Sequence, residues 1–201
     1  FYERRWVSPA ETLSDMEFSF SGPAGPIGTD LLFEAANLPS LRLGIEICED
    51  LWAVIPPSSG QALAGATVLA NLSASNEILG KVDYRRDLVR QQSGRCVAAY
   101  IYAGAGPGES STDLVYSGHC LIAENGSLLG ESERFMNQSI LLLREVDLQA
   151  LNHDRMKNTM FRDAPTDGGW RILSVELGRN PGTGGPKRKL ARRPFVPSGT
   201  S

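Results

Sequence analysis

The chain has 201 residues, enough for one substantial hydrophobic core, and its 41% hydrophobic and 21% charged residues are ordinary for a globular domain. Its formal net charge of −3 gives no global attraction to nucleic acid or to a membrane surface. The three cysteines do not suggest a disulfide framework, which favours a cytoplasmic setting. No apolar stretch is as long as the about 18 residues that a membrane-spanning helix needs.

The first half of the chain predicts alternating strands and helices. The first forty residues are punctuated by Gly and Pro and predict mainly loops. Apolar residues then recur at every second position from Leu41 to Ile47, which predicts a strand. A helix, a strand, a helix and a strand are expected next, from about Ser58, over 66–75, over 81–95 and over 96–106. This order is typical of crossover units in a layered α/β domain.

The second half has a different character. Two apolar runs flank Asn125 and Gly126, a strong signal for a β-hairpin, so we expect a mixed sheet. Residues 139–148 ("SILLLREVDL") predict a further strand, and a helix capped by Asp147 should follow. From Ala164 the composition shifts to Gly, Pro and basic residues, which predicts a linker rather than a core element.

Cys48 ends the period-two strand in the stretch "RLGIEICEDLW" and has two interpretations. The local pattern by itself favours a small buried hydrophobe. Alternatively, the thiol is a nucleophile at the carboxyl edge of the sheet, where α/β folds bind ligands. The adjacent carboxylates of Glu49 and Asp50 disfavour a thiolate, so a nucleophilic Cys48 needs a cation nearby in space, such as a lysine.

Other polar residues have structural and functional interpretations side by side. Ser73 and Ser75 follow the second apolar strand, where they would bind a small polar substrate or cap a turn. No Cys/His spacing typical of zinc is present, so we expect no metal. We expect His119 and His153 to have surface or hydrogen-bonded structural roles.

Several blocks of the chain together resemble one enzyme family. They are "FYERRW", "LGIEICEDLW", "ATVLANLSAS", "RRDLVRQQSGRCVAAYIYAGAGPGESSTDLVYSGH" and "ENGSLLGESERF". The resemblance is to the glutaminase domain of glutamine-dependent NAD synthetases, in the nitrilase or carbon–nitrogen hydrolase superfamily. It implies an α/β fold, the nitrilase-like four-layer α–β–β–α sandwich, incomplete at its N-terminal side. The partial glutaminase domain would span residues 1–163, and 164–201 would be a linker toward an absent synthetase domain.

The resemblance also implies a reaction and its residues. Cys48 would attack the side-chain amide of L-glutamine to form a thioester, and the released ammonia would supply an ATP-dependent NAD synthetase domain of the same polypeptide. The other implied site residues are the substrate-binding Glu49, Trp52, Ser75 and Lys81, and the auxiliary acid Glu3. Lys81 occupies a place where some relatives have Arg. A lysine there cannot bind a carboxylate through two parallel hydrogen bonds as an arginine does.

The family's catalytic Glu and Lys precede the block that begins at Phe1, so we expect glutaminase activity to need an upstream segment. The glutaminase part would use no cofactor, whereas the synthetase domain would use ATP and magnesium, and a homo-oligomer is expected. Two alternatives remain open from the sequence. One is a stand-alone amidase of the nitrilase superfamily, and the other is a non-catalytic binding or assembly module.

Overall fold

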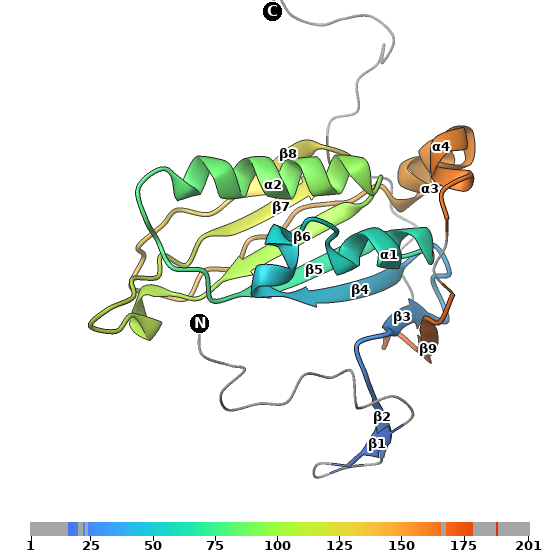
Figure 1. The fold of residues 1–201 in the computed structure, drawn as a ribbon, viewed down its shortest axis with the longest axis horizontal. Coiled ribbons are helices and arrows are strands. Elements are labelled where there is room, and N and C mark those ends of the chain that lie inside the picture. Colours follow the sequence, from blue (N-terminus) through green and yellow to red (C-terminus); the bar gives the residue numbers. More distant parts are fainter. Residues whose placement is uncertain (1–15, 20–21, 23, 166–167, 179–187, 189–201) are drawn as a thin grey trace, which may run out of the picture.

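The computed structural model describes residues 16–19, 22, 24–165, 168–178 and 188, which form a layered α/β structure (Figure 1). Seven strands make one mixed sheet in the order β8-β7-β6-β5-β4-β3-β9, and β1 and β2 form a separate antiparallel pair. The strands are β1 Met16–Phe18, β2 Gly25–Ile27, β3 Leu31–Ala35, β4 Arg42–Ile47, β5 Val68–Ser73, β6 Ala99–Gly104, β7 Cys120–Glu124, β8 Ser127–Glu131 and β9 Arg171–Val175. The helices are α1 Pro57–Leu63, α2 Lys81–Arg95, α3 Leu148–Lys157 and α4 Thr159–Arg162, with 3₁₀ turns η3 Cys48–Trp52 and η4 Pro107–Glu109.

The centre of the sheet is parallel and its flanks are mixed. β4, β5 and β6 run parallel to one another, joined by crossovers that contain α1 and α2. β3 and β7 pair antiparallel to this centre. Figure 1 shows α1 and α2 side by side on one face of the sheet. The carboxyl ends of the three parallel strands therefore meet at one edge, which is where such folds place functional side chains.

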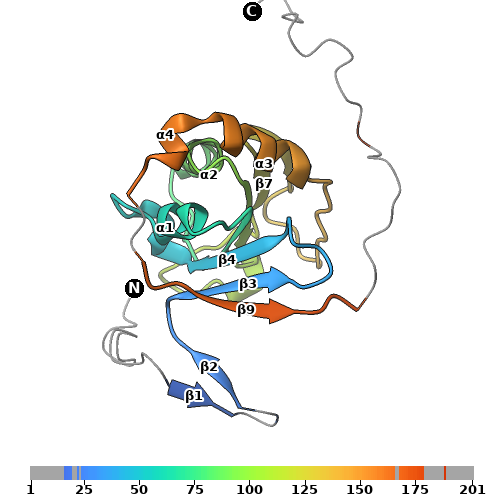
Figure 2. The same cartoon turned by 90° about the vertical axis from the view of Figure 1, so that its right-hand side faces the viewer.

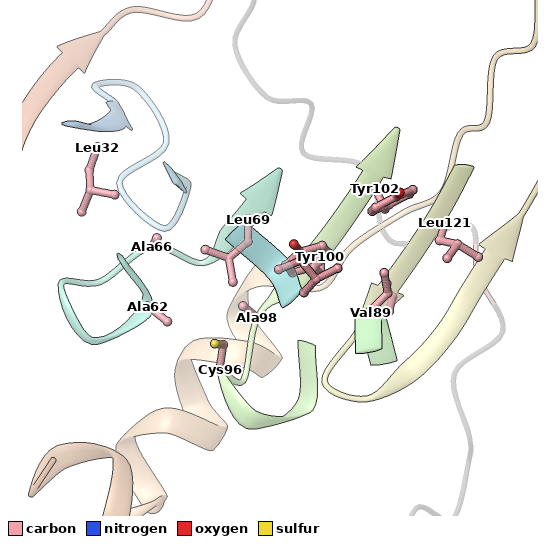
Figure 3. Packing of buried hydrophobic residues seen from close by; sticks show 12 residues of the cluster. Leu32, Ala62, Ala66, Leu69, Val89, Cys96, Ala98, Tyr100, Tyr102 and Leu121 are labelled. Carbon is pink, nitrogen blue, oxygen red and sulfur yellow. The ribbon is translucent and has the colours of Figure 1, made fainter. Parts of the chain in front are cut away.

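The hydrophobic core lies between the sheet and these two helices (Figure 3). Leu69 from β5 and Tyr100 from β6 pack there with Val89 from α2, all three fully buried. Val89 lies on the inner face of α2. Arg85 and Gln92 share that inner face, so the buried side of α2 is more polar than its apolar positions predict.

The opposite face of the sheet is apolar and partly exposed, although Val68 and Ala99 on that face are buried with Leu151 of α3 in a second core cluster. In β4 the buried residues are Gly44 and Glu46, so the apolar positions of the alternating pattern point away from α1 and α2. Ile47 is 63% exposed and Leu72 of β5 is 61% exposed on that face. Among the described residues, one helical layer and one sheet of the expected nitrilase-like sandwich are thus present.

The later elements confirm two predictions and correct one. β7 and β8 form the expected hairpin around Asn125 and Gly126. The side chain of Asp147 accepts a hydrogen bond from the backbone N–H of Ala150 and caps α3, as predicted. The strand predicted over 139–148 is wrong, because this segment is irregular until α3 begins. Its leucines at 141 and 143 are exposed, so no packing within the described residues favours an extended pairing.

β9 corrects the prediction of a linker after residue 163. Arg171–Val175 add a parallel strand beside β3, as Figure 2 shows, and Trp170 packs against the main core. The guanidinium of Arg171 pairs with the carboxylate of Asp30 at 2.7 Å. The Gly- and Pro-rich residues around this short apolar run were misleading, because its pairing with β3 makes it a strand. The three strands before Ala36 were likewise missed in a region expected to be mainly loops.

Candidate active site

Cys48 stands where β4 ends and the 3₁₀ turn η3 begins. Its φ of +50° lies in the left-handed region, which costs a residue with a side chain about 1–2 kcal/mol. Two hydrogen bonds hold this turn. The Asn71 side chain donates to the Cys48 carbonyl at 3.3 Å, and the Asp50 carboxylate accepts from the Ile47 N–H at 2.7 Å. The strained turn places a half-buried, free thiol at the edge where the parallel strands end.

Two hydroxyls from the neighbouring strands reach the thiol. The Ser73 hydroxyl, at the end of β5, donates to the Cys48 Sγ with an Oγ–Sγ distance of 3.6 Å. The Tyr102 hydroxyl, from β6, donates to the Ser73 Oγ at 2.7 Å. Both side chains are buried. β4, β5 and β6 therefore contribute one residue each to a continuous chain of hydrogen bonds that ends on the sulfur.

Lys81 supplies a cation on the same side of the molecule. Its ammonium donates to the Asn76 side chain at 2.9 Å and lies 5.4 Å from the centre of the Trp52 ring. Burial lowers the pKa of Lys81, as does the charge of Arg85. The neighbouring Cys48 and Glu49 act in the opposite direction, so the Lys81 ammonium and the thiol are within electrostatic reach of each other. A nucleophilic Cys48 requires a cation of this kind.

The structure brings most of the expected site residues to one region. Cys48, Glu49 and Trp52 all lie on η3, and Glu49 is exposed. Ser75 follows β5 and interacts with the Tyr102 hydroxyl, and Lys81 begins α2. The expected auxiliary acid Glu3 lies outside the described residues.

A buried polar network supports this region from behind. Arg85 pairs with the Glu77 carboxylate at 2.6 Å, and its guanidinium lies 5.8 Å from the centre of the Tyr102 ring. Burial raises the pKa of Glu77, but hydrogen bonds from Ser117 and Arg85 bring it below its ordinary value. The network links the loop before α2 to the strand that carries Tyr102. The sequence offered no signal for Arg85 beyond its place on the inner face of α2.

His119 belongs to the same network and has a structural role, as expected. Its Nδ1 lies 2.9 Å from the Arg85 guanidinium, which can only donate, so Nδ1 accepts. Its Nε2 then carries the proton and donates to the Glu131 carboxylate at 2.8 Å. Burial lowers the pKa of His119 despite the hydrogen bond with Glu131, so the imidazole is held neutral.

Within residues 16–19, 22, 24–165, 168–178 and 188, no group of three or more His, Cys, Asp or Glu side chains could hold a metal ion. No helix in that part of the chain is both long enough and apolar enough to cross a membrane. No protein-family model matches the chain.

Comparison with individual proteins gives a consistent set of relatives. A glutamine-dependent NAD(+) synthetase of Mycobacterium tuberculosis is 43% identical over 203 residues, which cover 98% of this chain and 30% of that protein. The crystal structure of a glutamine-dependent NAD(+) synthetase from Cytophaga hutchinsonii is similar with a TM-score of 0.55 and 32% identity, over 66% of this chain and 20% of that one. A carbon–nitrogen hydrolase from Helicobacter pylori shares the fold at 18% identity, with a TM-score of 0.51 over 61% of this chain and 46% of that one.

The seven-stranded mixed sheet, with its cysteine at a central strand end, has the fold of the nitrilase-type carbon–nitrogen hydrolases. By sequence, the chain is related over nearly all of its length to the glutamine-dependent NAD(+) synthetases. It spans 30% of the length of the curated relatives that it matches in this way.

Proposed function

We propose that this chain carries the glutaminase step of a glutamine-dependent NAD synthetase. The observation that carries the proposal is the placement of Cys48 at the carboxyl edge of the sheet. There, the Ser73 hydroxyl donates to its sulfur, and the Lys81 ammonium lies within electrostatic reach. A half-buried free thiol held in a strained turn at this edge, with a hydrogen-bond donor on its sulfur, fits a nucleophile.

In the proposed reaction, the Cys48 thiolate attacks the side-chain amide carbon of L-glutamine and forms a tetrahedral oxyanion. The carbon–nitrogen bond then breaks, the nitrogen takes a proton from a general acid, and ammonia leaves a thioester behind. Water adds to the thioester while a general base takes its proton, and the carbon–sulfur bond breaks to give glutamate and the thiolate. In the family that the chain resembles, a glutamate is the general base and a lysine helps to stabilise the thiolate and the oxyanion.

Substrate recognition falls to the residues around the thiol. Ser75 and Lys81 would bind the polar groups of glutamine, while Trp52 and Glu49 would line the approach. The Trp52 ring already contacts the Lys81 ammonium, which fixes that charge at the edge of the site. Lys81 would hold a substrate carboxylate as a single charge rather than as a bidentate fork.

The proposal extends to the partners of this reaction. Ammonia would pass to a synthetase domain of the same polypeptide, which would use ATP and magnesium, whereas the glutaminase step would need no cofactor. The similarity to proteins named glutamine-dependent NAD(+) synthetases supports this arrangement. Homo-oligomeric assembly stays a prediction.

Cys48→Ala in the complete protein encoded by the gene tests the proposal. We expect glutamine-supported NAD formation to fall at least about a thousandfold, because the nucleophile is lost. NAD formation supported by ammonium chloride should persist, since it bypasses the thioester. Cys120→Ala is the matched control, because Cys120 is also free and half-buried, and it should leave both rates unchanged.

Three results would contradict the proposal. Glutamine hydrolysis that survives Cys48→Ala would exclude the thioester route. Glutamine hydrolysis by the wild-type protein without ATP-dependent NAD formation would identify a stand-alone amidase. A complete protein that binds glutamine and does not hydrolyse it would be a binding module.

A further inference from the structure

Tyr102, Ser73 and Cys48 form a chain of two hydrogen bonds that ends on the sulfur. A buried tyrosine hydroxyl has one proton, and that of Tyr102 goes to the Ser73 Oγ at 2.7 Å. Burial raises the pKa of Tyr102, so the phenol keeps this proton through the neutral pH range. Because the Ser73 oxygen accepts from Tyr102, the single Ser73 proton is free to point at the Cys48 sulfur, 3.6 Å away.

The Ser73 hydroxyl is a donor that would interact differently with a thiolate and with a neutral thiol. A thiolate is a strong acceptor, and hydrogen bonds to ionised groups are roughly twice as strong as those between neutral groups. A neutral thiol gains much less from the same donor. The serine is also buried, so water competes weakly for its proton.

The charged groups around the thiol leave a role for such a neutral donor. Glu49 on the same turn is exposed, and Asp50 is engaged by the Ile47 N–H. Lys81, at the start of α2, interacts electrostatically with Arg85, Glu77, Cys48 and Glu49, so its charge is not directed at the sulfur alone. A serine hydroxyl does not titrate in the working pH range. Its contribution therefore persists whatever the protonation state of these neighbours.

We propose that Ser73 is a catalytic residue that donates a hydrogen bond to the Cys48 thiolate, and that Tyr102 is the positioning residue that aims it. The inference rests on the glutaminase function proposed above. Ser73 stabilises the nucleophile before attack on the amide carbon. It stabilises the same sulfur again when the thioester collapses and the thiolate leaves.

Alkylation of Cys48 by iodoacetamide in the complete protein tests this assignment without substrate. The thiolate displaces iodide from the reagent, and mass spectrometry of the peptide that contains Cys48 gives the rate at each pH. Ser73→Ala should lower the rate at pH 7 about tenfold, with the midpoint of the rate–pH profile moved to higher pH. Tyr102→Phe should lower the alkylation rate at pH 7 by about threefold. The Ser73 hydroxyl then keeps its proton but loses the hydrogen bond from Tyr102 that orients it.

Two further variants separate this role from a structural one. Ser73→Thr keeps the hydroxyl and should restore the wild-type midpoint. Ser93→Ala removes a buried hydroxyl that bonds the Ala98 carbonyl, far along α2, and should leave the profile unchanged. A folded Ser73→Ala protein with the wild-type midpoint overturns the proposal. If Ser73→Ala does not fold, as judged by circular dichroism, a wild-type midpoint in Tyr102→Phe overturns it instead.

The two experiments distinguish a failure of the proposed function from a failure of the role proposed for Ser73. Glutaminase activity that survives Cys48→Ala refutes the function, whatever the alkylation profiles show. A wild-type midpoint in Ser73→Ala, together with an inactive Cys48→Ala protein, refutes only the role of Ser73.

Discussion

Arg85 allows the supporting network to be tested by a single substitution. Its side chain is 1% exposed and pairs at 2.6 Å with Glu77, which is 9% exposed. Arg85→Met keeps most of the side-chain volume and removes the charge. Removing one partner of a buried ion pair typically costs about 3–5 kcal/mol, because the remaining charge is left uncompensated.

Two features of the site reduce that cost. The Ser117 hydroxyl at 2.6 Å and the Arg134 guanidinium at 3.7 Å still face the Glu77 carboxylate after the substitution. The Arg85 Nε and Nη2 atoms have no hydrogen-bond partner among the described residues. Removing them relieves a desolvation penalty of about 1–3 kcal/mol. The net loss of local stability should therefore be about 2 kcal/mol.

Native-state hydrogen exchange of the complete protein measures this loss where it occurs. A loss of about 2 kcal/mol corresponds to roughly thirtyfold faster exchange of the α2 amides. Arg86→Met is the matched control on the same helix. Arg86 is 30% exposed in its pairs with Asp83 and Glu131, so its loss should cost less than about 1 kcal/mol. Equal exchange rates in the two variants would refute the assignment of Arg85 as the centre of the network.

Two further substitutions test other parts of the structure through the melting temperature of the complete protein. Burial lowers the folded-state pKa of His119 below its ordinary 6.5, so the stability it contributes is present above that pH and is lost as the pH falls below it. The melting temperature should therefore drop less between pH 7.5 and 5.5 in His119→Gln than in the wild type, and an equal drop would contradict this. Gly44→Ala would place a methyl 2.4 Å from the Oε1 and 3.0 Å from the Cβ of the buried Gln61, and should cost about 1–3 kcal/mol. Gly106→Ala meets nothing within 4 Å and should be neutral, so a similar loss in both glycine variants would argue against this close contact.

Prediction from sequence succeeded where local pattern and tertiary packing agree. The period-two run before Cys48, the helix over 81–95 and the hairpin at Asn125 each carry a signal within one element. It failed for Arg171–Val175, a short apolar run inside a Gly- and Pro-rich stretch, which pairs with β3 as a strand. It failed in the other direction over 139–148, where Leu141 and Leu143 are exposed while Val146 and Leu148 pack against a core cluster without forming a strand.

The sequence by itself determined the order of the central elements, the cysteine at a strand end and the resemblance to one enzyme family. Only the tertiary structure decided which side chains meet that cysteine. Ser73, Tyr102 and Lys81 come from different elements, and the parallel pairing of β4, β5 and β6 aligns the strand ends. The structure also showed that the apolar positions of β4 face away from the helices, while Glu46 faces the core. Periodicity reports that a strand has two unlike faces, but only packing determines which of them is covered.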